Sequence, residues 1–260
     1  MSPVPANPVK AALRAGGVAF GSMAFEFDTR GIGRLAAGAG ADFLVYDLEH
    51  TGWSLETLGR LVAATPDALV PMTRVPTTQG HFISRALDVG ALGLMVPMVE
   101  SAEQAQEIVA AAKYPPVGRR GAAFGIAHDR FVGGAPTDTM ERANSETLVI
   151  AQIETVGGLE QVDAIAAVDE VDVLWVGHFD LTSSMGIPGQ FDHPDYLSAI
   201  ERVSAATTRA GKAAGFMCGS VEEGRRMLDL GYRAIAYWGD LWLYQSALAD
   251  GLRRLREPGR

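Results

Sequence analysis

The feature that most constrains the fold is a series of eight short apolar segments, each separated from the next by a helix-like stretch. The segments are residues 17–23, 41–47, 68–75, 91–99, 147–155, 171–180, 212–218 and 232–240. Each is nearly continuous in apolar residues and is bounded by Gly, Asp or Pro, as is typical of a strand buried on both faces. Eight such strands alternating with helices predict an α/β fold, a parallel (β/α)8 or TIM barrel. An open, doubly wound sheet is the alternative.

Serine residues mark where several of the intervening helices begin. Ser54, Ser101 and Ser220 each precede a polar first turn and an apolar repeat, a pattern typical of helix N-caps. Barrels of this kind reach the length of this chain as one unit, so residues 1–260 are predicted to form a single domain. The C-terminal segment 240–260 is amphipathic, and we expect it either to close the barrel as its last helix or to pack on a neighbouring subunit.

Charge and composition exclude several classes of protein. The net charge of -9 offers no electrostatic attraction to nucleic acid or to an anionic membrane. Apolar runs stay shorter than the roughly 18 residues of a membrane helix, and the first ten residues lack the apolar stretch of a signal peptide. The protein is therefore expected in the cytoplasm. Cys218 is the single cysteine, so any metal must be held by oxygen or histidine ligands.

Two loop features bear on ligand binding. The glycines at 38–40 precede a strand and lack the third glycine of a dinucleotide site, and no phosphate-binding Walker pattern occurs. The connection between residues 99 and 148 is long, basic and rich in glycine. We expect it to be an active-site loop, with His128, Asp129 and Arg130 as possible substrate contacts.

Polar residues gather at the ends of the predicted strands, which is where barrel enzymes have their active sites. They are Asp47, Glu49 and His50 after the second strand, Arg74 in the third, Gln152 and Glu154 in the fifth, His178 and Asp180 in the sixth, and Asp240 in the eighth. Buried charge is costly unless it is paired or binds a ligand. The predicted C-terminal mouth of the barrel is therefore the candidate site.

Glu154 and Asp180 end consecutive strands, so their carboxylates are expected to approach each other. Two hard oxygen ligands that leave positions for water suit Mg²⁺ or Mn²⁺. The alternative is that Glu154 caps a helix beginning at Gly157 and Asp180 caps the turn "LTSS".

A second group surrounds His50. Asp47 and Glu49 are two residues apart and point to one side of their strand, and Arg74 lies on the next strand. A basic imidazole flanked by carboxylates suits proton transfer, and Asp88 could set its tautomer. The alternatives are a hydrogen-bonded structural His50, an Arg74 that only neutralises its acidic neighbours, and a solvated Asp88.

Six ordered stretches resemble one family. "ADFLVYDLEH", "PMTRVP", "RALDVGALGLMVPMVESAEQA", "YPPVGRRG", "AQIET" and "WVGHFDLTSSMG" are similar to the motifs of the metal-dependent class II pyruvate aldolases of the 4-hydroxy-2-oxoheptanedioate aldolase type. The resemblance extends from about Gly17 to Asp240.

The resemblance implies roles for individual residues. It implies that Glu154 and Asp180 hold a divalent metal, Mg²⁺, Mn²⁺ or Co²⁺. It implies that His50 and Asp88 form a proton relay and that Arg74 stabilises the negative charge on the substrate oxygen.

The resemblance also implies how a 2-oxo acid is bound. Gln152 would lie beside it, and main-chain N–H groups around Gly177, Phe179 and Asp180 would hold its carboxylate. Asp47 and Glu49 would contact metal-bound water.

The implied reaction is a reversible aldol cleavage or addition of 4-hydroxy-2-oxo acids, with pyruvate or hydroxypyruvate as donor and an aldehyde as acceptor. No lysine ends a predicted strand, which argues against a Schiff-base aldolase. Alternatives are a lyase, decarboxylase or condensing enzyme that uses the same enolate on an oxaloacetate or citryl-type substrate, and a non-catalytic oxoacid-binding barrel. Relatives assemble as hexamers, trimers of dimers, so a homo-oligomer is expected.

The chain departs from the family pattern just before Asp180. His178 and Phe179 stand where relatives commonly have Pro and a small residue. We therefore expect His178 to contact the substrate or to narrow the pocket, and the aldehyde acceptor to differ. The alternative is that His178 is a structural residue behind the site.

Overall fold

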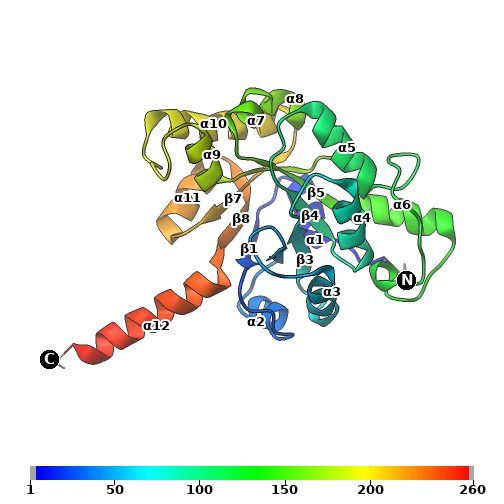
Figure 1. The fold of residues 1–260 in the computed structure, drawn as a ribbon, viewed down its shortest axis with the longest axis horizontal. Helices are drawn as coiled ribbons and strands as arrows, with labels where there is room; N and C mark the ends of the chain where they lie inside the picture. Colours follow the sequence, from blue (N-terminus) through cyan, green and yellow to red (C-terminus); the bar gives the residue numbers. More distant parts are fainter. Residues whose placement is uncertain (1–3, 258–260) are drawn as a thin grey trace.

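The computed structural model describes residues 4–257, and residues 1–3 and 258–260 of the predicted domain lie outside the described part. Eight parallel strands close into a barrel in chain order, which confirms the predicted fold (Figure 1). The strands are β1 (Ala19–Ala24), β2 (Phe43–Asp47), β3 (Val70–Arg74), β4 (Gly93–Val96), β5 (Leu148–Ile153), β6 (Val173–Val176), β7 (Ala213–Cys218) and β8 (Tyr232–Gly239).

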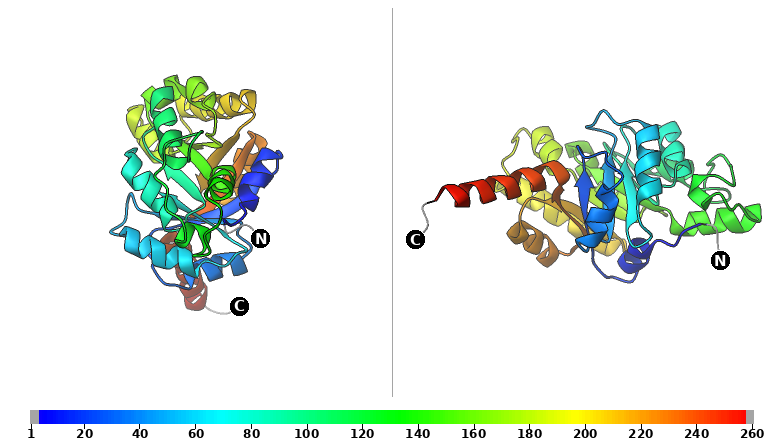
Figure 2. Two further views of the ribbon diagram at one scale, coloured as in Figure 1. Left: turned by 90° about the vertical axis from the view of Figure 1, so that its right-hand side faces the viewer. Right: turned by 90° about the horizontal axis from the view of Figure 1, so that it is seen from below.

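Helices surround most of the barrel (Figure 2). They are α1 (Pro8–Arg14), α2 (Ile32–Gly38), α3 (Leu55–Ala64), α4 (Gly80–Asp88), α5 (Ala102–Ala112), η1 (Ala127–Asp129), α6 (Pro136–Glu146), α7 (Val156–Glu160), α8 (Val162–Ala166), α9 (His178–Ser184), α10 (Pro194–Arg209), α11 (Val221–Asp229) and α12 (Asp240–Arg256). The predicted caps are confirmed, because the hydroxyls of Ser54, Ser101 and Ser220 accept backbone N–H bonds in α3, α5 and α11. None of the helices within residues 4–257 is long and apolar enough to cross a membrane.

Strand alternation divides the buried residues into two layers. Val45, Met72, Ile150 and Trp175 belong to the cluster inside the barrel. Their neighbours along the strands, such as Tyr46 and Leu174, pack instead against the helices. Because successive side chains on a strand point to opposite faces, residues two positions beyond an interior residue also face the interior. This rule decides which polar residues meet at the C-terminal mouth.

The connection from α5 to β5 lies at the N-terminal end of the barrel. It begins where α5 ends and leads into the first residue of β5, so it runs on the side opposite the C-terminal ends of the strands. Arg130 in this connection pairs with Asp67, which precedes β3. The prediction that this segment is an active-site loop of its own chain, with His128, Asp129 and Arg130 at the substrate, is wrong.

Helix α12 projects away from the barrel and carries the C-terminus (Figure 1). Tyr244, Leu248, Leu252 and Leu255 are exposed along it. Of the two arrangements expected for this segment, closure of the barrel as its last helix is therefore wrong. Packing on a neighbouring subunit stays a prediction.

Candidate active site

Polar side chains occupy the interior face of the barrel at its C-terminal end. Asp47 lies two residues beyond Val45, Arg74 two beyond Met72, and Gln152 two beyond Ile150. All three are buried. On each of these strands an apolar interior residue is followed, two positions later, by a polar interior residue. The barrel interior therefore has a polar layer above its apolar core.

Asp47 and Arg74 form a buried, two-pronged ion pair. The strand register sets them side by side, and Arg74 donates from Nε to Asp47 Oδ1 at 2.7 Å and from Nη2 to Oδ2 at 3.0 Å. The same two oxygens accept the backbone N–H groups of Glu49 and His50, each at 3.1 Å. A carboxylate has about four acceptor positions, and four donors occupy them here. This arrangement contradicts the role predicted for Asp47 at metal-bound water: Asp47 orients Arg74 and the turn that carries His50.

Glu49 and His50 lie in the turn that binds Asp47. Glu49 Oε2 lies 3.2 Å from Arg74 Nε, is buried, and accepts no hydrogen bond from residues 4–257. His50 is largely exposed, and its Nε2 lies 3.7 Å from Glu49 Oε2. The imidazole is therefore free to reach a ligand above the mouth while staying within range of an acidic neighbour.

Glu154 is held from two sides at the end of β5. Its Oε1 accepts the N–H of Met98 at 2.7 Å, and its Oε2 accepts from the Gln152 amide. Met98 has a positive φ of 56°, unusual for a residue with a side chain, and this backbone conformation aims its N–H at the carboxylate. Gln152 Oε1 is buried without a hydrogen-bond partner in the described chain. An acceptor atom is thus left unused beside Glu154.

Gly177 permits the close approach of β5 and β6. A Cβ at this position would overlap Glu154 Oε2 and would lie 2.8 Å from Gln152 Nε2. The N–H of Gly177 donates to Ile153 O at 3.1 Å, so it is already engaged. The main-chain groups left for a substrate carboxylate are those of the first turn of α9, which have no acceptor within the helix.

The sixth predicted strand is shorter than expected. It ends at Val176, and His178, Phe179 and Asp180 form the first turn of α9. Asp180 is exposed there, and its charge raises the pKa values of both Glu49 and Glu154. The charge of Asp180 therefore acts on both Glu49 and Glu154, and the predicted approach of Glu154 and Asp180 at a shared metal stays a prediction.

His178 lies in an aromatic cluster instead of among the carboxylates. Its ring centroid is 4.7 Å from Phe179, 5.3 Å from Phe191 and 5.1 Å from Phe216. Burial lowers its pKa to about 4, against the opposing effect of Asp180, so the ring is neutral near pH 7. Because Phe216 packs in the layer between strands and helices, His178 lies on the outer side of the barrel wall.

The carboxylates of Glu49 and Glu154 are not fully balanced by positive charge. Burial raises the pKa of Glu154 to about 7, with Glu49 and Asp180 adding to the rise. Burial likewise raises the pKa of Glu49 to about 7, although Arg74 opposes it. A bound cation would relieve this repulsion. Among residues 4–257 no cluster of three or more His, Cys, Asp or Glu side chains is arranged to hold a metal, so the protein would supply two carboxylates and leave the other positions to water or ligand.

Asp240 has a role that the sequence did not reveal. Its carboxylate accepts the N–H groups of Phe25, Glu26 and Phe27 in the loop after β1. These partners are more than 200 residues away in sequence, and no local pattern identifies them. The carboxylate of Asp240, predicted as a polar residue at the end of the eighth strand, thus binds backbone N–H groups of the loop after β1.

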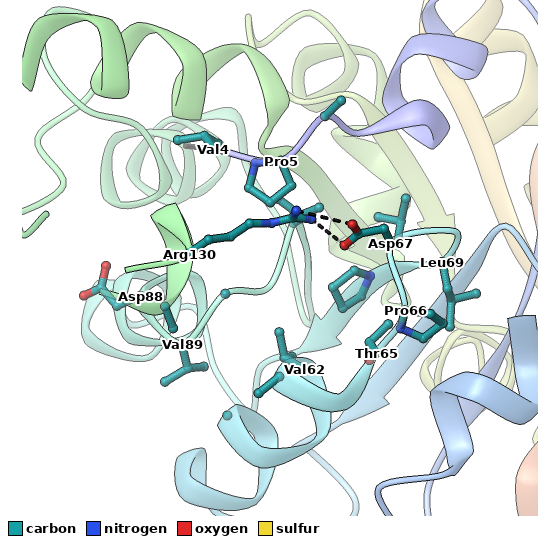
Figure 3. A pocket seen from close by; sticks show the side chains of 18 of the residues that line it. Val4, Pro5, Val62, Thr65, Pro66, Asp67, Leu69, Asp88, Val89 and Arg130 are labelled. Carbon is teal, nitrogen blue, oxygen red and sulfur yellow. Dashed lines mark hydrogen bonds and ion pairs between the residues drawn. The ribbon is translucent and has the colours of Figure 1, made fainter. Parts of the chain in front are cut away.

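Asp88 is not brought near His50 within one chain. It ends α4, at the N-terminal end of the barrel, and pairs with Arg120 at 2.6 Å. It borders a cavity of about 1000 Å³ there, in which Arg130 extends to Asp67 (Figure 3). His50, Glu154 and Asp180 lie at the other end of the barrel, so this cavity is separate from the candidate active site.

The structure defines the protein as a closed parallel barrel with buried carboxylates and a paired arginine at its C-terminal mouth. The family model described as HpcH/HpaI aldolase/citrate lyase matches residues 28–246, and the chain belongs to this family. This confirms the predicted family and the predicted class of enzyme, an aldolase among the carbon–carbon lyases.

Individual relatives match over nearly the whole chain. The hydroxypyruvate/pyruvate aldolase of Delftia acidovorans is 39% identical over 97% of this chain and 94% of its own length. The 4-hydroxy-2-oxovalerate aldolase of Novosphingobium aromaticivorans is 39% identical over 97% and 96%. The crystal structure of an HpcH/HpaI aldolase from Desulfitobacterium hafniense is 32% identical, with a TM-score of 0.91 over 96% of this chain and 97% of that one.

Proposed function

We propose that this chain is a divalent-metal-dependent aldolase that cleaves or forms 4-hydroxy-2-oxo acids, with pyruvate or hydroxypyruvate as the enolate donor and an aldehyde as acceptor. The observation that carries the proposal is the pair Glu154 and Asp180 at the mouth, where charge repulsion and burial favour a bound cation beside Arg74. The names of the two aldolase relatives support the donor and substrate class.

Glu154 and Asp180 would hold the metal, which we propose to be Mg²⁺, Mn²⁺ or Co²⁺. The donor set fits, because carboxylate oxygens are the ligands that hard divalent ions prefer, and Gln152 Oε1 and Glu49 Oε2 are buried acceptors without partners in the described chain. When bound, such an ion supplies Lewis-acid stabilisation of the enolate of a 2-oxo acid. Glu49 would accept a hydrogen bond from water in the ion's shell.

The chain's own residues supply the remaining chemistry. His50, exposed above the mouth, takes the proton from C3 of a pyruvate-like donor, or from the C4 hydroxyl in the cleavage direction. Arg74 stays protonated and donates to the developing oxyanion. The N–H groups of Phe179 and Asp180 would hold the substrate carboxylate, with Gln152 beside it. His178 packs against the ring of Phe179 and would thereby hold that ring where it narrows the binding site for the aldehyde acceptor.

A His50–Asp88 relay requires a second copy of the chain. Because the two residues lie at opposite ends of one barrel, Asp88 can approach His50 only from a neighbouring molecule. A homo-oligomer, proposed as a hexamer built from dimers, would supply that neighbour. It would also cover the exposed apolar face of α12.

The same metal-bound enolate would serve a lyase, decarboxylase or condensing enzyme. The family description includes citrate lyase, which supports this second candidate. A cytoplasmic location, the absence of nucleic-acid and membrane partners, and the single-domain organisation of residues 1–260 remain predictions.

Purified protein stripped with a chelator and refilled with Mg²⁺, Mn²⁺ or Co²⁺ tests the proposal. Pyruvate release from 4-hydroxy-2-oxo acids and proton exchange at pyruvate C3 should both depend on the added metal. Exchange without aldehyde addition would favour the second candidate. Full activity after complete metal removal would contradict both.

A further inference from the structure

The loop between β1 and α2 is fixed by one carboxylate from the far end of the chain. Asp240, the first residue of α12, accepts the N–H of Phe25 at 2.9 Å, of Glu26 at 3.1 Å and of Phe27 at 2.7 Å. β1 and β8 are neighbours in the closed barrel, which brings these residues together. Three charge-assisted bonds to one group hold this loop in a single conformation.

The bonds to Asp240 place the ring of Phe25. The ring packs edge-on against Trp242 with centroids 5.0 Å apart. Gly239 allows this contact, since a Cβ there would lie 2.7 Å from the Phe25 ring and 2.8 Å from Trp242. The first turn of α12 therefore holds Phe25 by its backbone, through Asp240, and by its side chain, through Trp242.

The Phe25 ring also contacts Arg74. The guanidinium carbon of Arg74 lies 5.8 Å from the centre of the Phe25 ring, within the range of a cation–π contact. Asp47 binds the guanidinium edge through Nε and Nη2. Asp47 and Phe25 together restrict where Arg74 can direct its remaining donors, which include Nη1.

We propose that Asp240 is a positioning residue for Arg74, acting through Phe25. The inference rests on the proposed function, in which Arg74 donates to a developing oxyanion. A fixed donor stabilises a transition state because it needs no rearrangement when charge develops. Release of Phe25 would let the guanidinium move and would slow enolate formation more than it weakens substrate binding.

Two variants and a matched control test the inference by kinetics. Asp240→Asn and Phe25→Leu should lower kcat for metal-dependent proton exchange at pyruvate C3 by about 3- to 30-fold, the range of a partly desolvated cation–π contact, with little change in KM. The double variant should be no slower than the slower single one, because both act through Arg74. Asp42→Asn is the control. Asp42 also binds a β1 backbone N–H, that of Phe20 at 2.8 Å, but at the other end of the barrel.

A second measurement does not depend on activity. Arg74 has little exposed surface, so its labelling by phenylglyoxal, followed by peptide mass spectrometry, reports whether Phe25 covers it. Labelling should rise several-fold in Asp240→Asn and Phe25→Leu and stay at the wild-type rate in Asp42→Asn. Labelling and exchange equal to those of the control in both variants would overturn the inference. A wild-type protein without pyruvate exchange would overturn the proposed function instead, and labelling alone would then decide the Phe25–Arg74 contact.

Discussion

Asp47 and Arg74 form a buried ion pair at the mouth of the barrel, with two parallel bonds of 2.7 and 3.0 Å between their side chains. Asp47 also binds the turn that leads to His50. The pair therefore joins the residue proposed to stabilise negative charge to the residue proposed to move the proton.

Replacing Asp47 by Asn should affect stability and catalysis together. Loss of Asp47's charge removes the fully buried partner of Arg74 and leaves Glu49 as its nearest carboxylate, and we expect the free energy of unfolding to fall by about 3–5 kcal/mol, measured by urea denaturation. Asp28→Asn is the control. It breaks the exposed pair with Arg60, which should cost less than about 1 kcal/mol. A similar small loss for both variants would contradict the buried-pair interpretation.

Glu154→Gln and Asp180→Asn should each abolish tight metal binding. The Gln side chain keeps an acceptor for the Met98 N–H but removes the charge, so the Kd for Mn²⁺ should rise at least about 100-fold, measured by titration calorimetry. Glu100→Gln changes an exposed carboxylate in the loop before α5 and should leave the Kd unchanged. Unaltered Mn²⁺ affinity in either site variant would remove that residue from the metal site.

His50→Ala should separate proton transfer from metal binding. The side chain is exposed and is not one of the two proposed metal ligands, so the Kd for Mn²⁺ should stay near the wild-type value. The rate of pyruvate C3 exchange should fall by about 10²- to 10⁴-fold, the usual contribution of a general base. Equal losses in exchange and in metal affinity would assign His50 to the metal instead.

A relay between copies predicts complementation. His50→Ala and Asp88→Ala proteins should each be impaired, and a co-refolded mixture should regain about a quarter of the wild-type activity if two copies exchange Asp88 symmetrically. A mixture of His50→Ala with Arg74→Ala is the control, because both changes lie at the same mouth and should not complement when the other copy supplies only Asp88. No recovery in the first mixture would leave Asp88 as the partner of Arg120 alone.

Metal-free protein should lose stability as the pH rises toward 7. The folded-state pKa values of Glu49 and Glu154 are raised from 4.5 to about 7, so the folded chain binds more protons than the unfolded chain between these values. Their contribution is fully present below pH 4.5 and is lost as the pH rises through about 7.

Saturating metal should oppose this loss. At a concentration of about 100 times the Kd, Mg²⁺ or Mn²⁺ should add about 2.7 kcal/mol, or roughly 5–11 °C in Tm by scanning calorimetry. The variant Glu49→Gln/Glu154→Gln should show a flatter pH dependence. A wild-type Tm that is independent of metal at pH 8 would count against the site.

Strand positions were predictable because short apolar runs bounded by Gly, Asp or Pro are typical of strands buried on both faces. The polar mouth was predictable because Asp47, Arg74, Gln152 and Glu154 all stand at the ends of such runs. The contacts of Asp240 were not predictable, since a carboxylate that binds backbone N–H groups 215 residues away depends on barrel closure and leaves no local pattern.

The wrong prediction for the connection between α5 and β5 has a different cause. Its composition suggested a binding loop, but its position after a helix already indicated the N-terminal end of the barrel. Connectivity was the better guide there than glycine content. The sequence identified Asp47 and Asp88 as carboxylates that need a partner, but which partner each one has depends on the three-dimensional structure. Asp47 pairs with Arg74, and Asp88 pairs with Arg120.

Gly177 sets a limit on the evolution of this chain. Any other residue at this position would place a Cβ against the carboxylate of Glu154 and the amide of Gln152. Substitutions that broaden the substrate range, in nature or by directed evolution, must therefore accumulate around a glycine that cannot itself vary. Phe179, two positions further on and exposed, is the nearest position where such variation is sterically open, because His178 between them packs against three aromatic rings.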